Sequence, residues 1–568
     1  MQNETYSGAQ IVVKLLERQG IDVVAGIPGG ANLPIYDALN HSPIRHILAR
    51  HEQGAGFIAQ GIARSTGEPA VCLASSGPGA TNLITAIADA KMDSIPVIAI
   101  TGQVPTSMIG TDAFQEVDTF GLMLPITKHN WVVRSAAELL EVIPEAFRIA
   151  LSGRPGPVAI DIPKDVQVEQ IEITRWPAPG RRDTNLPAPL DTQALHAALQ
   201  LLNKAKRPMM MIGGGVIHAG CSRTVASLAE KLDIPVVASF MGLGAMPTQH
   251  PLFLGMLGMH GARYTNLALD ECDVLLAAGV RFDDRATGNP SHFCSKAHII
   301  HIDIDASELD KIKIPAIGIN ADIGAATAYL LEHAQPQQRP AWRQEIAELR
   351  TRYPLEAVEG EQNNLFTPYA LLQTLAQLAP QDSLVVTDVG QHQMWTAQVY
   401  PFSHPRQWLS SGGLGTMGFG LPTAIGAALA QSERTVLCIS GDGSMLMNMQ
   451  ELDTLAEHHL NVKVIVLNNQ HLGLVKQQQT LFYGARHLAL RNRQSVDFSA
   501  MARAFGIGGY DLGRSNDPLV TLTQALQVPG PLLINVPIDP EAMVLPMVPP
   551  GAGNREMIIQ QPKQRASQ

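Results

Sequence analysis

The chain has 568 residues, of which 45% are hydrophobic and 16% are charged, and its formal net charge is −10. This length predicts three or four domains, and the negative charge argues against nucleic acid as a partner. The chain has no apolar stretch close to the roughly 20 residues that span a bilayer, and no signal or transit segment at its N-terminus. Its five cysteines lack CxxC spacing, which favours buried, reduced thiols. We therefore expect a cytoplasmic globular protein with no membrane partner.

The first part of the chain alternates strand-like and helix-like segments. Ser7 can cap a helix that ends at Gly20. Short apolar runs predict strands at 22–25, 44–49, 70–74, 97–100 and 158–160, with helical segments between them. This alternation predicts a parallel sheet with helices on both faces.

Two further units of the same kind follow. A proline-rich stretch at 176–189 predicts a linker, and strands are expected at 209–212, 236–239, 274–278 and 299–304. Residues 335–364 predict a second linker with one helix near 341–350, and the third unit begins near Thr367. The first and third units share a strand, glycine-turn, helix order. We predict an α/β fold of three doubly wound parallel-sheet domains, at 1–172, 190–334 and 365–545, with a tail at 546–568.

The strongest chemical signal lies in the third unit, between Arg434 and Val475. A buried strand at 435–440 ends in Gly441-Asp442-Gly443-Ser444, helical spacing covers 445–459, and a second strand at 463–467 ends at Asn468-Asn469. One crossover separates Asp442 from Asn469, so both are expected at the same carboxyl edge of a parallel sheet. A carboxylate and an amide oxygen beside glycine amides suit Mg²⁺ shared with a diphosphate. The alternative is a plain strand–helix–strand unit with a polar turn.

This pattern resembles the diphosphate-anchoring motif of thiamine-diphosphate enzymes. The resemblance implies that Asp442, Asn469 and the main-chain carbonyl of His471 hold the metal. Further loops resemble one branch of these enzymes, the acetohydroxyacid synthases (acetolactate synthases), and the match runs from the first helix to 548–552. It implies that thiamine diphosphate contacts Pro28, Gly30, Pro78, Asn82, Val389, Gly390, Gln391, His392, Gly415, Met417, Gly441, Gly443, Ser444 and Gly473.

Glu52 lies in Arg50-His51-Glu52-Gln53-Gly54, where a strand end opens a helix. Without other context it reads as a favourable first-turn charge at the helix dipole. The resemblance instead implies that Glu52 hydrogen-bonds the pyrimidine ring of the cofactor and so activates its thiazolium carbon. Burial would favour the protonated form that this role uses.

The middle unit resembles the FAD-binding domain of the same enzymes. Gly213-Gly214-Gly215 after a strand is weak by itself, and Asp303 and Asp305 suit either a ribose contact or helix capping. The resemblance implies an FAD site formed by Arg154, Gly213, Gly214, Gly215, Leu257, Gly258, Met259, His260, Gly279, Arg281, Asp283, Arg285, Asp303 and Asp322.

The substrate residues are also implied by the resemblance. Arg285 is expected to grip the carboxylate of a second 2-keto acid; the alternative is a surface ion pair with Asp283 or Asp284. Further substrate-channel matches are Phe114, Gln115, Met259 and Lys164, although a Phe or Met is more often a core residue. Gln478 stands where most of the family has Trp. We expect that, with Gln478 at this position, the enzyme loses most of the preference for 2-ketobutyrate as second substrate. The alternative is that Gln478 merely faces solvent.

The resemblance implies an acetolactate synthase catalytic subunit. Such an enzyme decarboxylates pyruvate and ligates the resulting hydroxyethyl carbanion to pyruvate or 2-ketobutyrate, in branched-chain amino-acid biosynthesis. Its implied cofactors are thiamine diphosphate, Mg²⁺ and FAD. A homodimer or tetramer with a small regulatory subunit is expected, with Glu52 of one copy facing Asp442 of another. Two alternatives are an FAD-dependent pyruvate oxidase and an inactive nucleotide-binding paralogue.

Overall fold

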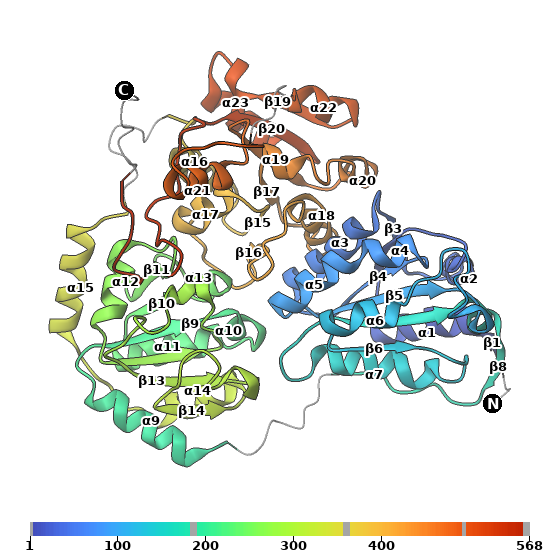
Figure 1. Ribbon diagram of the computed structural model, residues 1–568, viewed down its shortest axis with the longest axis horizontal. Coiled ribbons are helices and arrows are strands. Elements are labelled where there is room, and N and C mark those ends of the chain that lie inside the picture. Colours follow the sequence, from blue (N-terminus) through green and yellow to red (C-terminus); the bar gives the residue numbers. More distant parts are fainter. Residues whose placement is uncertain (1–3, 182–189, 356–363, 491–495, 561–568) are drawn as a thin grey trace.

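The computed structural model describes residues 4–181, 190–355, 364–490 and 496–560. Its strands form three six-stranded sheets and one two-stranded ribbon. Figure 1 shows each large sheet flanked by helices: the N-terminal unit in blue and cyan, the central unit in green, and the C-terminal unit in orange and red. The predicted α/β class with three parallel sheets is confirmed. The domain limits stay predictions, since parts of both linkers and of the tail lie outside the described residues.

The N-terminal sheet has the strand order β3-β2-β4-β5-β7-β6, and all of its pairs are parallel. Ser7 caps α1, and Gly20 ends it in the left-handed conformation, as predicted. The strands are β2 (Val23–Gly26), β3 (Arg45–Leu48), β4 (Ala70–Ala74), β5 (Val97–Gln103), β6 (His129–Val132) and β7 (Val158–Pro163); β1 (Glu4–Ser7) pairs antiparallel with β8 (Gln170–Ile173). The helices are α1 (Gly8–Gln19), α2 (Leu33–Leu39), α3 (Glu52–Thr66), α4 (Pro78–Asn82), α5 (Ile84–Asp93), α6 (Thr119–Met123), α7 (Leu139–Leu151) and α8 (Lys164–Val168), with η1 (Thr106–Met108) and η2 (Leu124–Ile126).

The C-terminal sheet repeats this topology. Its order is β16-β15-β17-β18-β20-β19, again fully parallel, so both sheets follow the pattern 2-1-3-4-6-5 when strands are counted within each unit. The strands are β15 (Leu384–Thr387), β16 (Trp408–Leu409), β17 (Val436–Gly441), β18 (Val462–Asn468), β19 (Gly508–Asp511) and β20 (Leu532–Pro537). The helices are α16 (Pro368–Leu378), α17 (Gln391–Val399), α18 (Gly420–Ala430), α19 (Asp442–Met445), α20 (Glu451–Glu457), α21 (Gly473–Phe482), α22 (Phe498–Ala504) and α23 (Pro518–Gln527), with η5 (Leu512–Arg514).

The central sheet has a different order, β11-β10-β9-β12-β13-β14. Counted within the unit this is 3-2-1-4-5-6, the order of dinucleotide-binding folds, whose ligands bind beyond the carboxyl ends of strands 1 and 4. The strands are β9 (Pro208–Ile212), β10 (Val236–Ala238), β11 (Phe253–Met256), β12 (Val274–Ala278), β13 (His298–Asp303) and β14 (Ile317–Asn320). The helices are α9 (Thr192–Lys204), α10 (Gly214–His218), α11 (Ser222–Leu232), α12 (Arg263–Glu271), α13 (Asp284–Thr287), α14 (Ile323–His333) and α15 (Pro340–Arg352), with η3 (Phe240–Gly242) and η4 (Ala306–Glu308).

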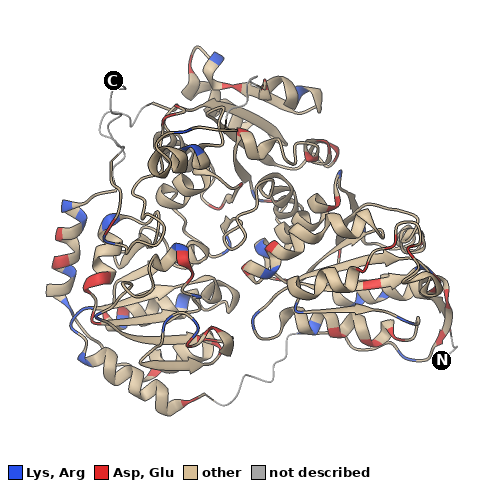
Figure 2. Ribbon diagram, in the orientation of Figure 1, with Lys and Arg blue, Asp and Glu red and all other residues tan. Residues whose placement is uncertain are grey.

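Two predicted segments differ from the structure. The helix expected over 445–459 is interrupted, because α19 ends at Met445 and α20 begins at Glu451. Buried Asn448 lies in the break and donates to the Gly418 carbonyl at 2.6 Å. The helix expected in the second linker is α15, but it packs on the central unit through Trp342 and Ile346. Figure 2 shows basic and acidic residues interspersed along the outer side of α15.

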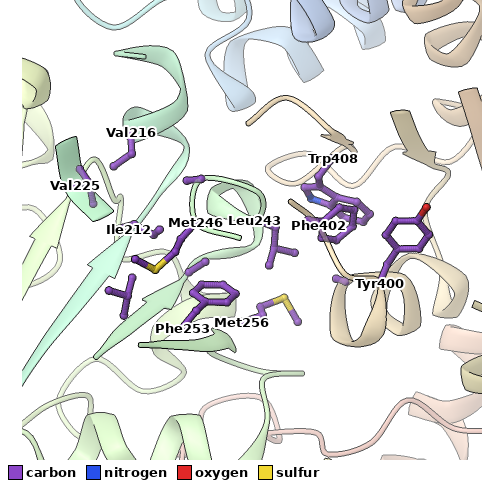
Figure 3. Close-up of a cluster of buried hydrophobic side chains, with 14 of the residues drawn as sticks. Ile212, Val216, Val225, Leu243, Met246, Phe253, Met256, Tyr400, Phe402 and Trp408 are labelled. Atoms are coloured by element: carbon purple, nitrogen blue, oxygen red, sulfur yellow. The ribbon is translucent and has the colours of Figure 1, made fainter. Parts of the chain in front are cut away.

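Buried side chains join the units. One apolar cluster continues from the central sheet into the C-terminal unit, and Figure 3 shows Leu243 between Met246 on the central side and Phe402 and Trp408 on the C-terminal side. A second cluster joins the N- and C-terminal units, where α3 packs on α18. All five cysteines are buried and unpaired, as predicted. Within the described residues, no helix has both the length and the apolar character needed to cross a bilayer.

Candidate active site

Asp442 and Asn469 lie at the carboxyl ends of two neighbouring strands. β17 and β18 pair in parallel with Gly441 opposite Leu467, so Asp442 and Asn469 leave the sheet at the same edge, as predicted. Both side chains are buried. Gly441 has an extended backbone (φ −93°), so its glycine is not needed for a left-handed turn. Its role is space, because a Cβ there would lie 2.9 Å from the His392 ring.

The His392 ring lies inside this edge. Burial lowers the pKa of His392 to about 3, so its imidazole is neutral at physiological pH. Its Nε2 is buried and has no hydrogen-bond partner among the described residues. Gly390 also leaves room for the ring, since a Cβ there would lie 2.8 Å from His392 Cε1. A buried ring nitrogen without a partner, beside two glycines, fits a phosphate ligand that supplies the missing hydrogen bond.

The predicted metal ligands are all hard oxygen donors. Asn469 Oδ1 accepts the His471 N–H at 3.0 Å, and Asn469 Nδ2 donates to Gln391 Oε1 at 3.2 Å, which fixes the amide with its oxygen toward His471. No group of three or more His, Cys, Asp and Glu suited to a metal occurs in the described part of the chain. The predicted site needs no such group, because one carboxylate, one amide and one carbonyl suit Mg²⁺ when a diphosphate and water complete the shell.

The loop 410–420 holds Gly415 and Met417 above this edge. Buried Asp388, at the end of β15, accepts the N–H groups of Gly418 at 2.9 Å and Gly420 at 3.0 Å. Burial raises the pKa of Asp388 to about 6. Gly415 adopts a left-handed conformation (φ 69°), and Met417 is half-buried with its Cε facing Gly443. The loop is thereby anchored at its C-terminal end by its own unit.

Glu52 occupies the matching edge of the N-terminal sheet. It begins α3, with His51 as the capping residue, so the predicted strand-end position is correct. Asn82 Nδ2 donates to Glu52 Oε2 at 2.9 Å, and a Cβ on Gly79 would lie 3.4 Å from Oε1. The loops after β2 and β4, which carry Pro28, Gly30 and Pro78, flank this edge. Glu52 is half-buried.

The expected substrate residues of the N-terminal unit are exposed. Phe114 is 88% exposed, so the alternative that it is a core residue is wrong. Gln115 adopts a left-handed conformation (φ 59°), and its backbone packs against Gly77. Glu116 organises this loop by accepting the N–H groups of Thr111 at 3.2 Å and Ala113 at 3.0 Å. Lys164 is also exposed, at the start of α8.

One cavity gathers the residues that were predicted to bind FAD. It lies at the carboxyl ends of β9 and β12, where the strand order reverses and a dinucleotide is expected. The N- and C-terminal units complete its wall. The predicted FAD residues lining it are Arg154, Gly214, Gly215, Leu257, Met259, His260, Gly279, Arg281, Asp283, Arg285, Asp303 and Asp322. Gly213 and Gly258 do not line the cavity, although each adjoins residues that do.

The glycines of this cavity permit close backbone approach. A Cβ on Gly213 would lie 2.0 Å from the Gly279 carbonyl oxygen, and one on Gly215 would lie 2.7 Å from Gly279 Cα. The Gly279 backbone already occupies this space, so these glycines let the loops after β9 and β12 pack together at the edge where a dinucleotide is expected. Burial raises the pKa of Asp303 to about 6. The support for a dinucleotide is the position of the cavity, at the carboxyl ends of the strands where the order reverses.

Acidic residues in and beside the cavity also cap helices. Asp283, Asp305 and Asp322 accept N–H groups at the starts of α13, η4 and α14. For Asp305, which does not line the cavity, the capping alternative is correct. Arg154 reaches across from the N-terminal unit and pairs with Glu308 at 2.7 Å and Asp305 at 3.3 Å.

Arg285 and Gln478 meet in this same cavity. The Arg285 guanidinium lies 3.6 Å from Asp284, which is the ion pair of the alternative interpretation, and its side chain is 64% exposed. Because it faces both Asp284 and the cavity, the ion pair and an anion contact are compatible. Gln478 is exposed on α21 and also faces the cavity.

The same cavity separates the residues that were predicted to contact thiamine diphosphate or substrate into two groups. Val389, Gly415, Arg285 and Gln478 line it, whereas Glu52, Phe114, Gln115 and Lys164 are absent from its described lining. Sequence reasoning also missed residues that do line it, including Asp93, His218 and Gln393. The helix α5 carries Asp89, Lys91 and Asp93 among its ten residues, so its local sequence does not single out Asp93.

The chain matches the thiamine pyrophosphate enzymes in all three units. Residues 6–122 match the N-terminal TPP-binding domain, 195–330 the central domain and 388–536 the C-terminal TPP-binding domain. The chain therefore belongs to the thiamine pyrophosphate enzyme family.

Three relatives show which members of this family the chain resembles. It is 54% identical to the acetolactate synthase isozyme 1 large subunit of Escherichia coli, over 97% of this chain and 98% of the relative. It is 45% identical to the isozyme 2 large subunit of the same organism, over 97% and 99%. It is 44% identical to the chloroplastic acetolactate synthase 1 of Nicotiana tabacum, over 98% and 86%. Within the family, the chain groups with acetolactate synthase large subunits.

Proposed function

We propose that this chain is the catalytic subunit of an acetolactate synthase. It decarboxylates pyruvate and joins the remaining two-carbon unit to a second 2-keto acid, pyruvate or 2-ketobutyrate, in branched-chain amino-acid biosynthesis. The observation that carries the proposal is the cavity in which Arg285 and Gln478 meet Val389 and Gly415. Similarity to acetolactate synthases over nearly the full length supports the same reaction. This similarity does not favour the two alternatives, a pyruvate oxidase and an inactive paralogue.

The cofactor residues have separate tasks. Thiamine diphosphate, when bound, supplies the nucleophilic carbon and accepts the electrons that decarboxylation releases. Asp442, Asn469 and the His471 carbonyl hold Mg²⁺, which neutralises the diphosphate charge. The unpartnered His392 Nε2 hydrogen-bonds a phosphate oxygen, and Glu52 holds a proton at the pyrimidine ring nitrogen.

The cavity residues orient the substrate and FAD. The Arg285 guanidinium binds the carboxylate of the second keto acid bidentately, because its ion pair with Asp284 is long at 3.6 Å and leaves donors facing the cavity. Gln478 borders the acceptor and offers an amide where an apolar side chain would contact an extra methyl group. The Gly213–Gly215 segment and Asp303 hold FAD.

A second copy of the chain completes the site. Among the residues that the structure describes, Glu52, Phe114, Gln115 and Lys164 do not line the cavity of their own chain, and Phe114 is largely exposed. We infer a homodimer at least, with these residues serving the partner's cofactor, and a tetramer as its larger form. A small regulatory subunit and a cytoplasmic location complete the proposal.

A single anaerobic incubation distinguishes this reaction from an oxidase. The purified chain receives pyruvate, thiamine diphosphate, Mg²⁺ and FAD in the absence of any electron acceptor. The synthase produces acetolactate and CO₂ while the flavin absorbance stays that of the oxidised form. Flavin that bleaches in proportion to the pyruvate consumed, without acetolactate, would identify an oxidase and refute the proposal. An inactive paralogue would give neither signal.

A further inference from the structure

A buried ion cluster in the N-terminal unit contacts the loop that carries Met417. Arg64 of α3 pairs with Asp89 at 3.0 Å and with Asp93 at 2.9 Å, both on α5. The three side chains are at most 3% exposed. Burying charges this completely destabilises the folded chain unless every charge is paired and hydrogen-bonded. We therefore expect the carboxylate oxygens of Asp89 and Asp93 to accept further hydrogen bonds besides those from Arg64.

Those donors all come from loop 410–418 of the C-terminal unit. Asp93 accepts two consecutive backbone N–H groups, from Gly412 at 3.0 Å and Gly413 at 2.7 Å. Asp89 accepts the Thr416 hydroxyl at 2.8 Å and also the Ser411 hydroxyl. These bonds join segments more than 300 residues apart in the sequence.

The glycines of the loop permit this contact. A Cβ on Gly413 would lie 3.0 Å from Asp93 Oδ1 and 2.8 Å from the Met92 Cβ, so a larger residue would push the backbone off the carboxylate. Arg64 also donates to the Ser410 carbonyl at 2.9 Å. The cluster thus holds the N-terminal part of the loop, opposite the end that Asp388 holds.

We propose that Arg64, Asp89 and Asp93 are positioning residues that fix loop 410–418 and thereby set the place of Met417 beside the bound cofactor. The clamp itself stands on the contacts of the loop, whereas its effect on catalysis rests on the proposed function. The N-terminal unit then has two roles: it presents Glu52 at one edge, and it shapes the cofactor site of its own chain through α5.

The test measures backbone hydrogen exchange in peptides covering 410–418, in the full chain with and without thiamine diphosphate and Mg²⁺. Asp89→Asn removes the charge that accepts both hydroxyls. Thr416→Val removes the hydroxyl that donates to Asp89 and keeps the shape of the side chain. Thr416 is only half-buried, so this variant still tests the clamp if Asp89→Asn fails to fold. Hydrogen bonds to charged groups predict about ten- to a hundredfold faster exchange in the loop. Thr416→Ser keeps the hydroxyl and is expected to exchange at the wild-type rate.

A matched control is available in the central unit. Asp273 also accepts two consecutive backbone N–H groups, from Lys206 at 2.7 Å and Arg207 at 3.0 Å, but contacts no part of loop 410–418. Asp273→Asn is expected to leave exchange in the loop unchanged. Calorimetric titration adds a second readout: Asp89→Asn is expected to weaken thiamine diphosphate binding about tenfold or more.

Two results would overturn the clamp. One is wild-type exchange over 410–418 in both Asp89→Asn and Thr416→Val. The other is a lower thermal midpoint of Asp89→Asn with unchanged loop exchange, which would reduce the cluster to a core ion network. Failure of the proposed function is seen separately, as a wild-type chain that binds no thiamine diphosphate; loop exchange in the cofactor-free chain still decides the clamp.

Discussion

At the scale of single residues, we expect Gln478 to influence which keto acid is joined second. A methylene group in an apolar pocket is worth about 1–3 kcal/mol, or roughly 10–200-fold in selectivity. The polar, exposed Gln478 lacks that apolar surface, so we expect pyruvate and 2-ketobutyrate to be accepted with similar ease.

The corresponding variant is Gln478→Trp, assayed with both keto acids at equal concentrations. We expect the wild type to give a mixture and the variant to shift it toward acetohydroxybutyrate. A wild-type mixture dominated by acetohydroxybutyrate, or a ratio that Gln478→Trp leaves unchanged, would show that Gln478 only faces solvent.

Asp161 makes stability depend on pH. Burial raises the pKa of this carboxyl from 3.8 to about 7, against hydrogen bonds from Thr101 at 2.6 Å and Gln103 at 2.9 Å. Between these pH values the native chain binds the proton that the unfolded chain has released. The contribution of Asp161 to stability is therefore fully present below pH 3.8 and is lost as pH rises toward about 7.

Asp161→Asn removes this titration. The free energy of unfolding of the variant, relative to wild type, is expected to rise steadily as the pH is increased through this window. Denaturant unfolding at a series of pH values measures the difference. A difference that stays constant with pH would contradict the assignment.

Residue-level prediction from the sequence succeeded where chemistry follows strand ends. Asp442 and Asn469 were placed at one edge because parallel strands align their carboxyl ends, and β17 and β18 are indeed neighbours. Arg64, Asp89 and Asp93 were not found, because their partners lie in another unit and no local pattern reports a contact across that distance. The roles of the predicted site residues remain proposals.

At the scale of elements, the close packing of α3 on α18 positions Glu52. A Cβ on Gly426 would lie 1.9 Å from the Ile58 carbonyl oxygen, and one on Gly61 would lie 2.1 Å from that of Thr423. Both contacts are with backbone atoms, so neither helix can yield by moving a side chain alone.

Gly426→Ala is therefore expected to lower the free energy of unfolding by about 1–3 kcal/mol, the cost of overpacking. Denaturant unfolding is the measurement. Gly508→Ala is a matched control in the same unit, because its Cβ would meet Leu532 at an ordinary 3.4 Å. Equal stabilities of the two variants would contradict the close contact between α3 and α18.

Element prediction failed where tertiary contacts override local pattern. The apolar spacing continues through Met445, Met447 and Met449, but the helix breaks because Asn448 turns inward to bond Gly418. The sequence analysis did not predict nine of the strands: β1, β6, β8, β11, β14, β15, β16, β19 and β20. All of them except β20 have four residues or fewer, a length at which a periodic pattern is easily missed, although β2 and β3 are equally short and were predicted.

At the scale of the whole molecule, the shared site can be tested by mixing two inactive chains. Glu52→Gln is expected to slow catalysis by roughly 10²–10⁴-fold, and Asp442→Ala is expected to lose Mg²⁺ and thiamine diphosphate. If Glu52 serves the partner's cofactor, a mixed dimer contains one intact site. Co-expression should then restore about a quarter of the wild-type activity. A mixture as inactive as its parts would place both residues in a site within one chain.

The sequence predicted three units because each sheet repeats the order strand, turn and helix. It did not predict how the three units are arranged. The cavity between them depends on contacts such as Arg154 with Glu308, which join different units. Sequence periodicity indicates which face of a helix is buried. It does not indicate which unit covers that face.

The central claim is that this chain makes acetolactate with thiamine diphosphate, Mg²⁺ and FAD. The most direct measurement is acetolactate formation from pyruvate by the purified chain, supplied with all three cofactors and then with each omitted in turn. We predict acetolactate with the complete set and a loss of activity on omitting any one of them. No acetolactate from the complete set would contradict the account, and undiminished formation without thiamine diphosphate would contradict the site at Asp442.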